Sequence, residues 1–271
     1  MPSSRRRLLS GLTASLILAR PAFARPAGRL WPHGARAAVS LTYDDGLDSQ
    51  LQNAVPALDA AGFKATFFLT EENMAARLDD WARVAADGHE VADHTVTHPC
   101  KLSGYRSSGF RDRELQPMEA FLDAHFGTGR VRTFAYPCGE TGLGRGSGLR
   151  RRERYLKALK GEVIAARTVD GPPNDPRRVL RDRFRLDAFE PTYEVDHPRL
   201  AFRYIRRAVG AGAWAILVFH DVLPERRRDG DTRIAVHDQI LAWLKTAPVW
   251  CAPMGHVFDH VARAEGGLRR V

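Results

Sequence analysis

A short apolar run and two histidines meet in residues 88–99, which read GHEVADHTVTHP. Val91 and Ala92 indicate a strand that ends just before His94, and His98 follows four positions later. Imidazoles at positions i and i+4 beyond a strand end can turn toward one point, and neutral imidazole is the commonest metal ligand in proteins. The alternative is two unrelated histidines on the surface or in the core. A metal site therefore requires a third ligand from elsewhere in the chain.

An earlier apolar run, residues 37–43, ends in two adjacent acids, Asp44 and Asp45, which Gly46 follows. Two acids that close a buried strand cost free energy unless they are solvated or used. The simple alternative is an Asp-Gly turn. Because neighbouring side chains on a strand point in different directions, one carboxylate can bind a metal while the other acts as a base.

Apolar strand patterns alternate with helical patterns along the chain, up to and including its last stretch. Further strands are predicted at residues 63–69, 131–136, 163–170, 214–219 and 249–252, and helices at 50–61, 117–126, 200–211, 234–244 and 255–263. This alternation predicts an α/β fold, a distorted (β/α)7-type barrel in a single domain. The carboxyl ends of the strands carry the chemistry in such barrels, and Asp44, Asp45, His94 and residues 137–139 fall at such ends.

Two later segments add candidates. The most apolar predicted strand, residues 214–219, ends in His220, and a histidine at the mouth of a buried strand suits an acid catalyst. The alternative is a histidine held by Asp221 or by a backbone carbonyl. Residues 142–154 are glycine-rich and then strongly basic, which predicts a mobile surface loop. Such charge runs are usually solvated, and a grip on an anionic substrate is the second interpretation.

The N-terminus predicts export. Residues 1–24 combine Arg5, Arg6 and Arg7 with a short apolar stretch and an Ala-Phe-Ala site. The paired arginines before Leu8 resemble a twin-arginine signal, with ordinary Sec export or an uncleaved anchor as alternatives. We therefore expect a linker at 25–34, one domain at 35–263 and a tail at 264–271. The mature protein would be periplasmic or secreted, with no transmembrane span after signal removal.

Charge and cysteine content limit the partners. Removing the four arginines of residues 1–24, which hold no acid, lowers the formal net charge from +9 to +5. A basic mature protein favours anionic polymers, and nothing resembles a nucleic-acid motif, so we expect no nucleic-acid partner. The three cysteines are Cys100, Cys138 and Cys251. An exported protein can oxidise a pair, and Cys100–Cys138 is the candidate pair; three buried free thiols are the alternative.

Taken in order, these motifs resemble those of the polysaccharide deacetylases that share the NodB homology domain, carbohydrate esterase family 4. TYDDG at 42–46 is similar to the family's T-F-D-D-G motif, and HTVTH at 94–98 to its H-[ST]-x-x-H motif. FAYPCG at 134–139 and VFH at 218–220 resemble the third motif and the L-x-H motif. The resemblance runs from about residue 35 to 261, and it implies a NodB-like fold. It also implies removal of acetyl groups, N-acetyl first, from a carbohydrate or cell-envelope polysaccharide.

The resemblance assigns roles at the metal. Asp45, His94 and His98 would bind one divalent ion, most often zinc, although this ligand set also accepts cobalt, nickel or manganese. Asp44 would be the general base and His220 the general acid.

The third motif would supply the rest of the site. The backbone N–H of Cys138, within Tyr136-Pro137-Cys138, would help to stabilise the oxyanion. Thr95 or Thr97 could orient a ligand through a hydrogen bond.

The chain also departs from the family pattern. Ala135 stands where the third motif often has an arginine, so the group that usually holds the base is missing. Arg167, near the end of the predicted strand 163–170, is the candidate replacement. The fourth motif is not clear, and Asp170 or Asp175 are candidates to hold His220. Three alternative functions remain at this point: an O-acetyl esterase on acetylated glycans, a non-catalytic glycan-binding protein on the same fold, and a generic basic binder of the cell envelope.

Overall fold

The computed structural model describes residues 30–127, 132–191 and 197–266. The predicted export signal at residues 1–24, half of the predicted linker (25–29) and most of the predicted tail (267–271) lie outside the described residues. Within the described ranges, no helix has both the length and the apolar composition that a membrane crossing requires.

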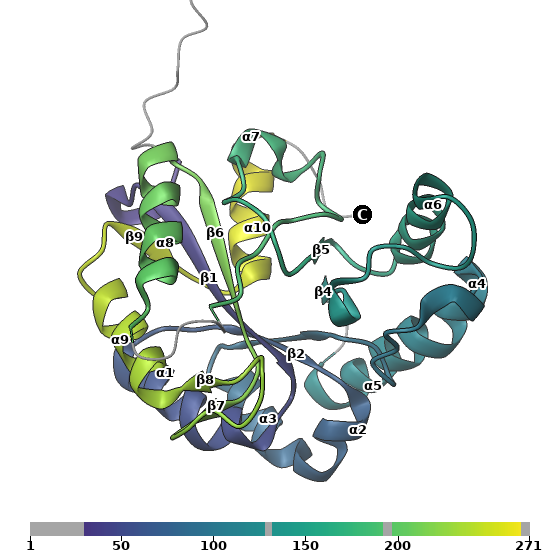
Figure 1. Ribbon diagram of the computed structural model, residues 1–271, viewed down its shortest axis with the longest axis horizontal. Coiled ribbons are helices and arrows are strands. Elements are labelled where there is room, and N and C mark those ends of the chain that lie inside the picture. The colour runs from purple at the N-terminus through teal and green to yellow at the C-terminus, as the bar shows by residue number, and fades with distance from the viewer. Residues whose placement is uncertain (1–29, 128–131, 192–196, 267–271) are drawn as a thin grey trace, which may run out of the picture.

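One curled sheet of parallel strands forms the centre of the fold (Figure 1). The strand order is β5-β4-β3-β2-β1-β6, and β9 also pairs with β1. The bounds are β1 Ala37–Asp45, β2 Thr66–Leu69, β3 Glu90–Asp93, β4 Thr133–Ala135, β5 Ala165–Arg167, β6 Trp214–Phe219 and β9 Val249–Cys251. All eight residues from Ala37 to Asp44 in β1 are buried, as expected for a parallel strand that is covered on both faces.

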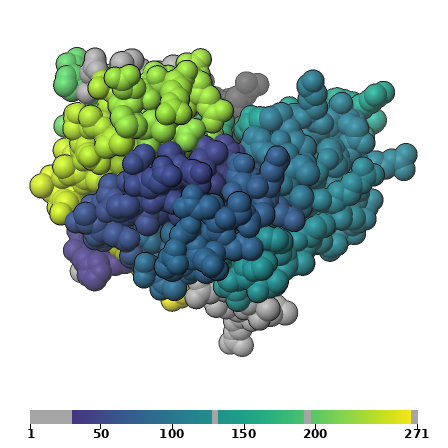
Figure 2. All heavy atoms as spheres, turned by 90° about the horizontal axis from the view of Figure 1, so that it is seen from below, coloured from purple at the N-terminus to yellow at the C-terminus, as the bar shows by residue number. Residues whose placement is uncertain are grey.

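Helices cover the sheet, and segments from the two halves of the chain pack directly against each other (Figure 2). The helices are α1 Val55–Ala61, α2 Glu71–Met74, α3 Leu78–Ala86, α4 Ser107–Phe110, α5 Gln116–Phe126, α6 Gly148–Leu159, α7 Pro176–Val179, α8 Arg199–Ala211, α9 Ile234–Leu244 and α10 Met254–Ala264. Two π-helical turns, Gln50–Ala54 and Arg111–Leu115, precede α1 and α5. A small separate pair, β7 Val222–Leu223 and β8 Thr232–Arg233, follows β6.

The sheet is a half-barrel because β5 and β6 do not pair along their length. The irregular chain between them closes the gap through single bridges, from Leu186 to Arg167 and from Phe189 to Leu217. The backbone of Phe189 also exchanges hydrogen bonds with Ile216 and Val218, both 2.9 Å long. The predicted α/β fold with a distorted barrel of parallel strands is therefore confirmed, and the irregular segment becomes part of the wall beside the end of β6.

The prediction of a mobile loop at residues 142–154 is wrong in its second half. Residues Gly148–Leu159 form α6, which buries Tyr155, Ala158 and Leu159 against the domain. These three apolar side chains recur at helical spacing just beyond the arginines. The arginines dominate the composition of the segment, whereas the buried stripe decides its structure.

Candidate active site

The carboxyl ends of five parallel strands meet around one point. They carry Asp44 and Asp45 at the end of β1, His94 after β3, Tyr136 to Cys138 after β4, Arg167 at the end of β5 and His220 after β6. This arrangement places residues from distant parts of the sequence at one edge of the sheet, which is where α/β barrels hold their chemistry.

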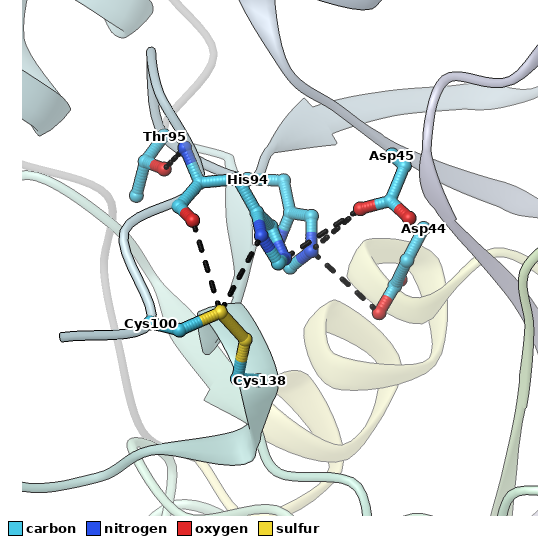
Figure 3. Close-up of a disulfide and its surroundings, with 7 residues drawn as sticks. Asp44, Asp45, His94, Thr95, Cys100 and Cys138 are labelled. Atoms are coloured by element: carbon cyan, nitrogen blue, oxygen red, sulfur yellow. Dashed lines mark hydrogen bonds and ion pairs between the residues drawn. A yellow bond between two sulfur atoms is a disulfide. The ribbon is translucent and has the colours of Figure 1, made fainter. Parts of the chain in front are cut away.

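Three groups converge with metal-ligand geometry (Figure 3). The Nε2 atoms of His94 and His98 each lie 3.5 Å from Oδ1 of Asp45, and the three ligand atoms lie within 4.8 Å of one another. Two ligand atoms at zinc bonding distance and a tetrahedral angle are separated by about 3.3 Å. The cluster therefore fits a small divalent ion. Its outer side is open to solvent, because the side chains of Asp45 and His98 are 20% and 31% exposed.

The buried histidine of this cluster is held in the form that a metal needs. Nδ1 of His94 lies 2.9 Å from the carbonyl oxygen of Ala135, which fixes the proton on Nδ1 and leaves Nε2 free to bind. Burial lowers the pKa of His94 to about 4, despite the opposing charges of Asp44 and Asp45. His94 is therefore neutral at neutral pH.

The second acid of the pair has a different partner. Asp44 is buried and accepts a hydrogen bond from the guanidinium of Arg167, which is itself buried. Burial alone would raise the pKa of Asp44, but Arg167, His94 and His220 outweigh burial and hold it below its ordinary value. The guanidinium also lies 4.8 Å from the ring centre of Phe68, so both its charge and its flat face have partners.

The position of this arginine explains the missing residue of the third motif. In the sheet register, Arg167 of β5 is the direct partner of Ala135 of β4. The guanidinium of Arg167 therefore comes from the strand beside the motif position, at the same level along the sheet. From this strand the guanidinium reaches the carboxylate of Asp44.

His220 faces a carboxylate that the sequence reasoning missed. Its Nδ1 lies 3.0 Å from Oε1 of Glu190. Burial would lower the pKa of His220, but the adjacent carboxylate of Glu190 and the charges of Asp44 and Asp45 raise it to about 9. His220 is therefore cationic at neutral pH, as an acid must be.

The residues proposed to hold His220 do other work. Asp175 caps α7 by accepting from the backbone N–H of Arg177. Asp221 accepts from the hydroxyl of Ser49 at 2.6 Å and pairs with Arg228. Asp170 makes no contact with His220 within the described residues. The predictions for Asp170 and Asp175 are therefore wrong. No spacing rule points to Glu190, because it lies in irregular chain that is docked beside β6.

The loop that carries the two histidines is fixed by its threonines. The hydroxyl of Thr95 accepts from the backbone N–H of His98 at 3.0 Å. Thr97 donates through its backbone N–H and its hydroxyl to Glu114, at 3.1 and 3.0 Å. Both threonines thus position the backbone of the loop, and neither hydrogen-bonds an imidazole. Glu114, on the second π-helical turn, is a further support that the sequence did not reveal.

Backbone strain is concentrated at this site. Five non-glycine residues in the described ranges have positive φ, and four of them are Asp45, Thr95, His98 and Cys138. Each such conformation costs roughly 1–3 kcal/mol and persists only where the surroundings enforce it. The fold therefore spends stability to aim two of the three ligand side chains and the third motif.

The third motif presents a free amide. Cys138 has φ 54°, and its backbone N–H donates to no acceptor within the described part of the chain. A disulfide joins Cys138 to Cys100, which settles the cysteine pairing that the sequence left open. In Figure 3 the disulfide lies on one side of His94, and the two carboxylates lie on the other. The disulfide therefore ties the loop after His98 to the loop that offers this amide.

Tyr136 and Pro137 are not displayed to a substrate. Both are buried, and the hydroxyl of Tyr136 donates to the carbonyl of Phe184 at 2.9 Å. The ring packs on Tyr155 of α6 with centroids 4.8 Å apart. The prediction of an oxyanion site at residues 136–138 therefore stays with the backbone of Cys138. Their part is to anchor the loop that carries Cys138.

A buried amide side chain links the carboxyl ends of β1 and β6. Nε2 of Gln50 donates to the carbonyl of Asp44 at 2.5 Å and to the carbonyl of His220 at 3.1 Å. Gln50 begins a π-helical turn, a feature that is frequent at functional sites. No sequence signal marks this role, because the residues around Gln50 have an ordinary helical pattern.

Comparison with known families gives a match to the first half of this site. Residues 33–144 match the family model described as polysaccharide deacetylase, which confirms the resemblance that the motifs indicate. The matched segment holds Asp44, Asp45, His94, His98 and Cys138. Arg167, Glu190 and His220 lie beyond it.

Curated relatives match shorter segments. A peptidoglycan-N-acetylglucosamine deacetylase of Bacillus cereus is 38% identical over 85 residues, which cover 31% of this chain and 30% of that protein. A chitooligosaccharide deacetylase of Bradyrhizobium sp. is 39% identical over 95 residues, covering 32% and 39%. A gellan lyase of Bacillus sp. is 32% identical over 110 residues, covering 41% and 4%. The aligned part of this chain thus spans well under half the length of these relatives.

Solved structures share the whole architecture. A protein of Mycobacterium smegmatis designated a polysaccharide deacetylase has a TM-score of 0.61 at 18% identity, over 89% of this chain and 95% of that one. A pseudoenzyme of the CE4 family from Bacillus anthracis has a TM-score of 0.54 at 20% identity, over 83% and 66%. At these identities the comparison establishes the fold alone.

Proposed function

We propose, on the premise that residues 33–144 belong to the polysaccharide deacetylase family, that this protein is a metal-dependent hydrolase that removes acetyl groups from a carbohydrate. One observation carries the proposal. The three ligand atoms of Asp45, His94 and His98 converge beside an ionised Asp44 and a cationic His220. Two titratable groups whose environments drive their pKa values apart are typical of a base and an acid.

The N-acetyl group is the first choice of substrate. The matching segments of the Bacillus cereus and Bradyrhizobium relatives come from proteins named as deacetylases of N-acetylglucosamine in peptidoglycan and of chitooligosaccharides. An amide also needs more help than an ester, since its nitrogen is too basic to leave unprotonated. The raised pKa of His220 suits that demand.

The chain's own residues divide the work. A bound divalent metal supplies a Lewis acid, which polarises the acetyl carbonyl and lowers the pKa of water to about 7. Asp44 takes the proton of the attacking water, and Arg167 holds its carboxylate in place. The free N–H of Cys138 stabilises the negative charge that develops on the acetyl oxygen, a contribution of roughly 2.7–4 kcal/mol for one donor. His220 then protonates the leaving nitrogen while Glu190 orients its ring.

Zinc is the proposed metal. One carboxylate and two imidazoles, with an open position left over, are a usual set for catalytic zinc. Cobalt, nickel and manganese also fit such ligands. Dialysis against chelator followed by addition of each ion separately, with acetate release and bound metal measured together, identifies the ion that restores activity at the lowest concentration.

We also propose that the protein acts outside the cytoplasm, in the periplasm or as a secreted protein. The basic and apolar pattern of residues 1–24 supports export. The Cys100–Cys138 disulfide is a second support, because such bonds persist mainly in oxidising compartments. N-terminal sequencing of the exported protein should find a start at Arg25, and a start at Met1 would contradict cleavage.

Acetate release from a matched panel of N-acetylated and O-acetylated oligosaccharides tests the proposal. We expect release from the N-acetylated members, its loss with chelator and its return with zinc. Asp44→Asn should keep the metal and lower turnover by at least about a thousandfold, since it removes the base but no ligand. Unchanged turnover of Asp44→Asn overturns the mechanism. Release from O-acetylated members alone replaces N-deacetylation with an esterase activity, and glycan binding without any release points to a non-catalytic binder.

A further inference from the structure

A basic depression lies apart from the catalytic cluster, between α4 and α6, which pack together at one edge of the molecule (Figure 1). Its volume is about 770 Å³. Five cationic side chains line it: Arg106, Arg111, Arg145, Arg154 and Lys157. No carboxylate is among the lining residues, so the depression presents one sign of charge.

Most of this positive charge is not neutralised by the protein. Arg106, Arg145 and Lys157 are exposed and form no ion pair within the described residues. Arg111 is the exception, since it lies 3.4 Å from Asp112 and 3.9 Å from Glu162. A concave surface with unpaired charges of one sign concentrates ions of the opposite sign.

The depression is also held in shape. The guanidinium of Arg154 donates to the carbonyl oxygens of Leu143 and Arg145. The backbone carbonyl of Arg154 accepts from the hydroxyl of Ser107 at 2.9 Å. The hydrogen bonds of the guanidinium go to neutral carbonyls, so they fix it in place without cancelling its charge. The exposed Ser103 and Ser108 add hydroxyl groups beside the cations. Fixed guanidinium groups with hydroxyl neighbours suit an oxygen anion.

The same loops that build the metal site build this depression. Ser103 follows His98 by five positions, so their Cα atoms lie within about 18 Å of each other. Leu102 accepts a backbone hydrogen bond from Gly144 at 2.9 Å, and the Cys100–Cys138 disulfide joins the same two segments nearer the metal site. A short oligosaccharide can cover such a distance. One chain could therefore place an acetyl group at the metal site and an acidic substituent in the depression.

A lipid surface fits the depression less well. Membrane-surface helices present a wide apolar face beside their cations. Leu149 is 76% exposed, and it is the one large apolar side chain that α6 leaves open to solvent among the described residues. A single leucine beside a hollow does not make such a face.

We propose that this basic depression is a second binding site for an anionic group, a carboxylate or a phosphate, on the same glycan chain that is deacetylated at the metal site. The inference rests on the proposed deacetylase function and narrows its substrate class to acidic glycans. Arg106, Arg145 and Lys157 supply the unpaired charges, and Arg154 supplies a fixed donor.

Three forms of one oligosaccharide test the proposal: N-acetylchitohexaose, the same chain oxidised to carboxylates at some C6 positions, and the same chain phosphorylated there. The variant combines Arg106→Gln, Arg145→Gln and Lys157→Gln. For the anionic forms we expect KM to rise by about tenfold with kcat unchanged, because three exposed ion pairs together supply about that factor. For the neutral form KM should stay within about twofold. Added salt should weaken the binding of the anionic forms alone.

The control combines Arg203→Gln, Arg207→Gln and Lys245→Gln, which remove the same number and kind of exposed cations far along the chain. Its KM values should match those of the unmodified protein. An equal rise of KM in the control would show that the effect comes from net charge and not from the depression, which would overturn the proposal. Comparing the carboxylated with the phosphorylated chain shows which acid the depression prefers.

Calorimetric binding of the anionic chains separates this proposal from the proposed function. If acetate is released but the triple variant binds and turns over anionic chains like the unmodified protein, the second site is refuted and the deacetylase stands. If no acetate is released but the triple variant loses binding, the second site stands as an acidic-glycan site without the activity. Binding to phosphatidylglycerol vesicles that the triple variant loses, with no binding of the anionic chains, would assign the depression to a membrane and overturn the proposal.

Discussion

The proposed metal ligands Asp45, His94 and His98, the metal-facing half of the site, come from the end of β1 and from the loop that follows β3, both within residues 33–144. The groups proposed to support acid–base chemistry, Arg167 and Glu190, come from a three-residue strand and from irregular chain beyond that segment. The difference follows from what each group must do. A ligand must reach one point at bonding distance, so its strand position is fixed. A supporting charge must only touch another side chain, and several backbone positions allow that.

Arg167 is the clearest case of this freedom. It stands beside Ala135 in the sheet register, so the guanidinium enters from the adjacent strand at the same level. The carboxylate of Asp44 has a cationic partner although the motif position holds Ala135. A departure from a family motif therefore changes the side chain at one backbone position. Whether the chemistry is lost depends also on the side chains of the neighbouring strands.

The largest effect is expected from the metal-facing half. His94→Ala removes a buried ligand and should abolish stoichiometric metal binding. Without the Lewis acid, which contributes several kcal/mol, acetate release should fall by at least about a thousandfold. Metal analysis and acetate release on the same sample measure both effects. His256→Ala, which changes an exposed histidine on α10, should alter neither. Full metal content in His94→Ala would remove this residue from the ligand set.

A smaller effect is expected from the supporting half. Arg167→Ala leaves the buried carboxylate of Asp44 without its cation, and we expect kcat to fall by roughly a hundredfold while the metal content stays unchanged. The double variant Ala135→Arg with Arg167→Ala returns the guanidinium to the other strand. It should recover part of the lost turnover if only the position of the charge matters.

The outcome distinguishes the two halves directly. If Arg167→Ala loses metal as readily as His94→Ala, the arginine stabilises the whole site, and metal binding does not depend on the ligands alone. If its turnover equals that of the unmodified protein, Arg167 does not replace the motif arginine. The single variant Ala135→Arg is the reference for the strain of placing a large side chain at a buried position.

The extent of prediction from sequence divides along the same line. Strand ends could be located because β1 and β6 are mainly apolar runs that stop at Asp44 and His220. Their convergence followed from the parallel topology, in which carboxyl ends share one edge. Glu190 could not be located, since it reaches His220 only because Phe189 docks on β6 through backbone hydrogen bonds between residues far apart in sequence. The helix α6 was likewise not predicted, because its arginines made the segment resemble a solvated loop.

Glu190→Gln should act on the pH dependence of turnover. The pKa of His220 is raised to about 9, so the proton-donating form is present below that pH and is lost as the pH rises through it. Glutamine keeps the shape of residue 190 but removes the charge, and the pKa of His220 should fall toward its ordinary value although Asp44 and Asp45 still face it. The alkaline limb of the profile of kcat against pH should therefore move to lower pH. A fall of one pKa unit lowers the rate about tenfold above both pKa values.

Glu225→Gln is the matched control, because Glu225 is exposed on the segment after β6 and should leave the profile unchanged. An alkaline limb that stays in place in Glu190→Gln would show that Glu190 is not what keeps the acid protonated.

The smallest effect on turnover should come from the bond that joins the two halves. The Cys100–Cys138 disulfide links the loop after His98 to the loop with the free amide, yet none of the three ligand atoms belongs to it. Replacing both cysteines by serine should lower the free energy of unfolding by about 2–4 kcal/mol, since the bond restrains the unfolded chain. Metal content should stay complete and kcat should fall by only about threefold, because positive φ at Cys138 is also enforced by the buried anchor of Tyr136.

Thermal unfolding and acetate release with and without reductant measure both quantities, and reductant should change the unmodified protein but not the double serine variant. A loss of metal in that variant would mean that the disulfide sets the position of His98, and the metal-facing half would then depend on more than the ends of its strands.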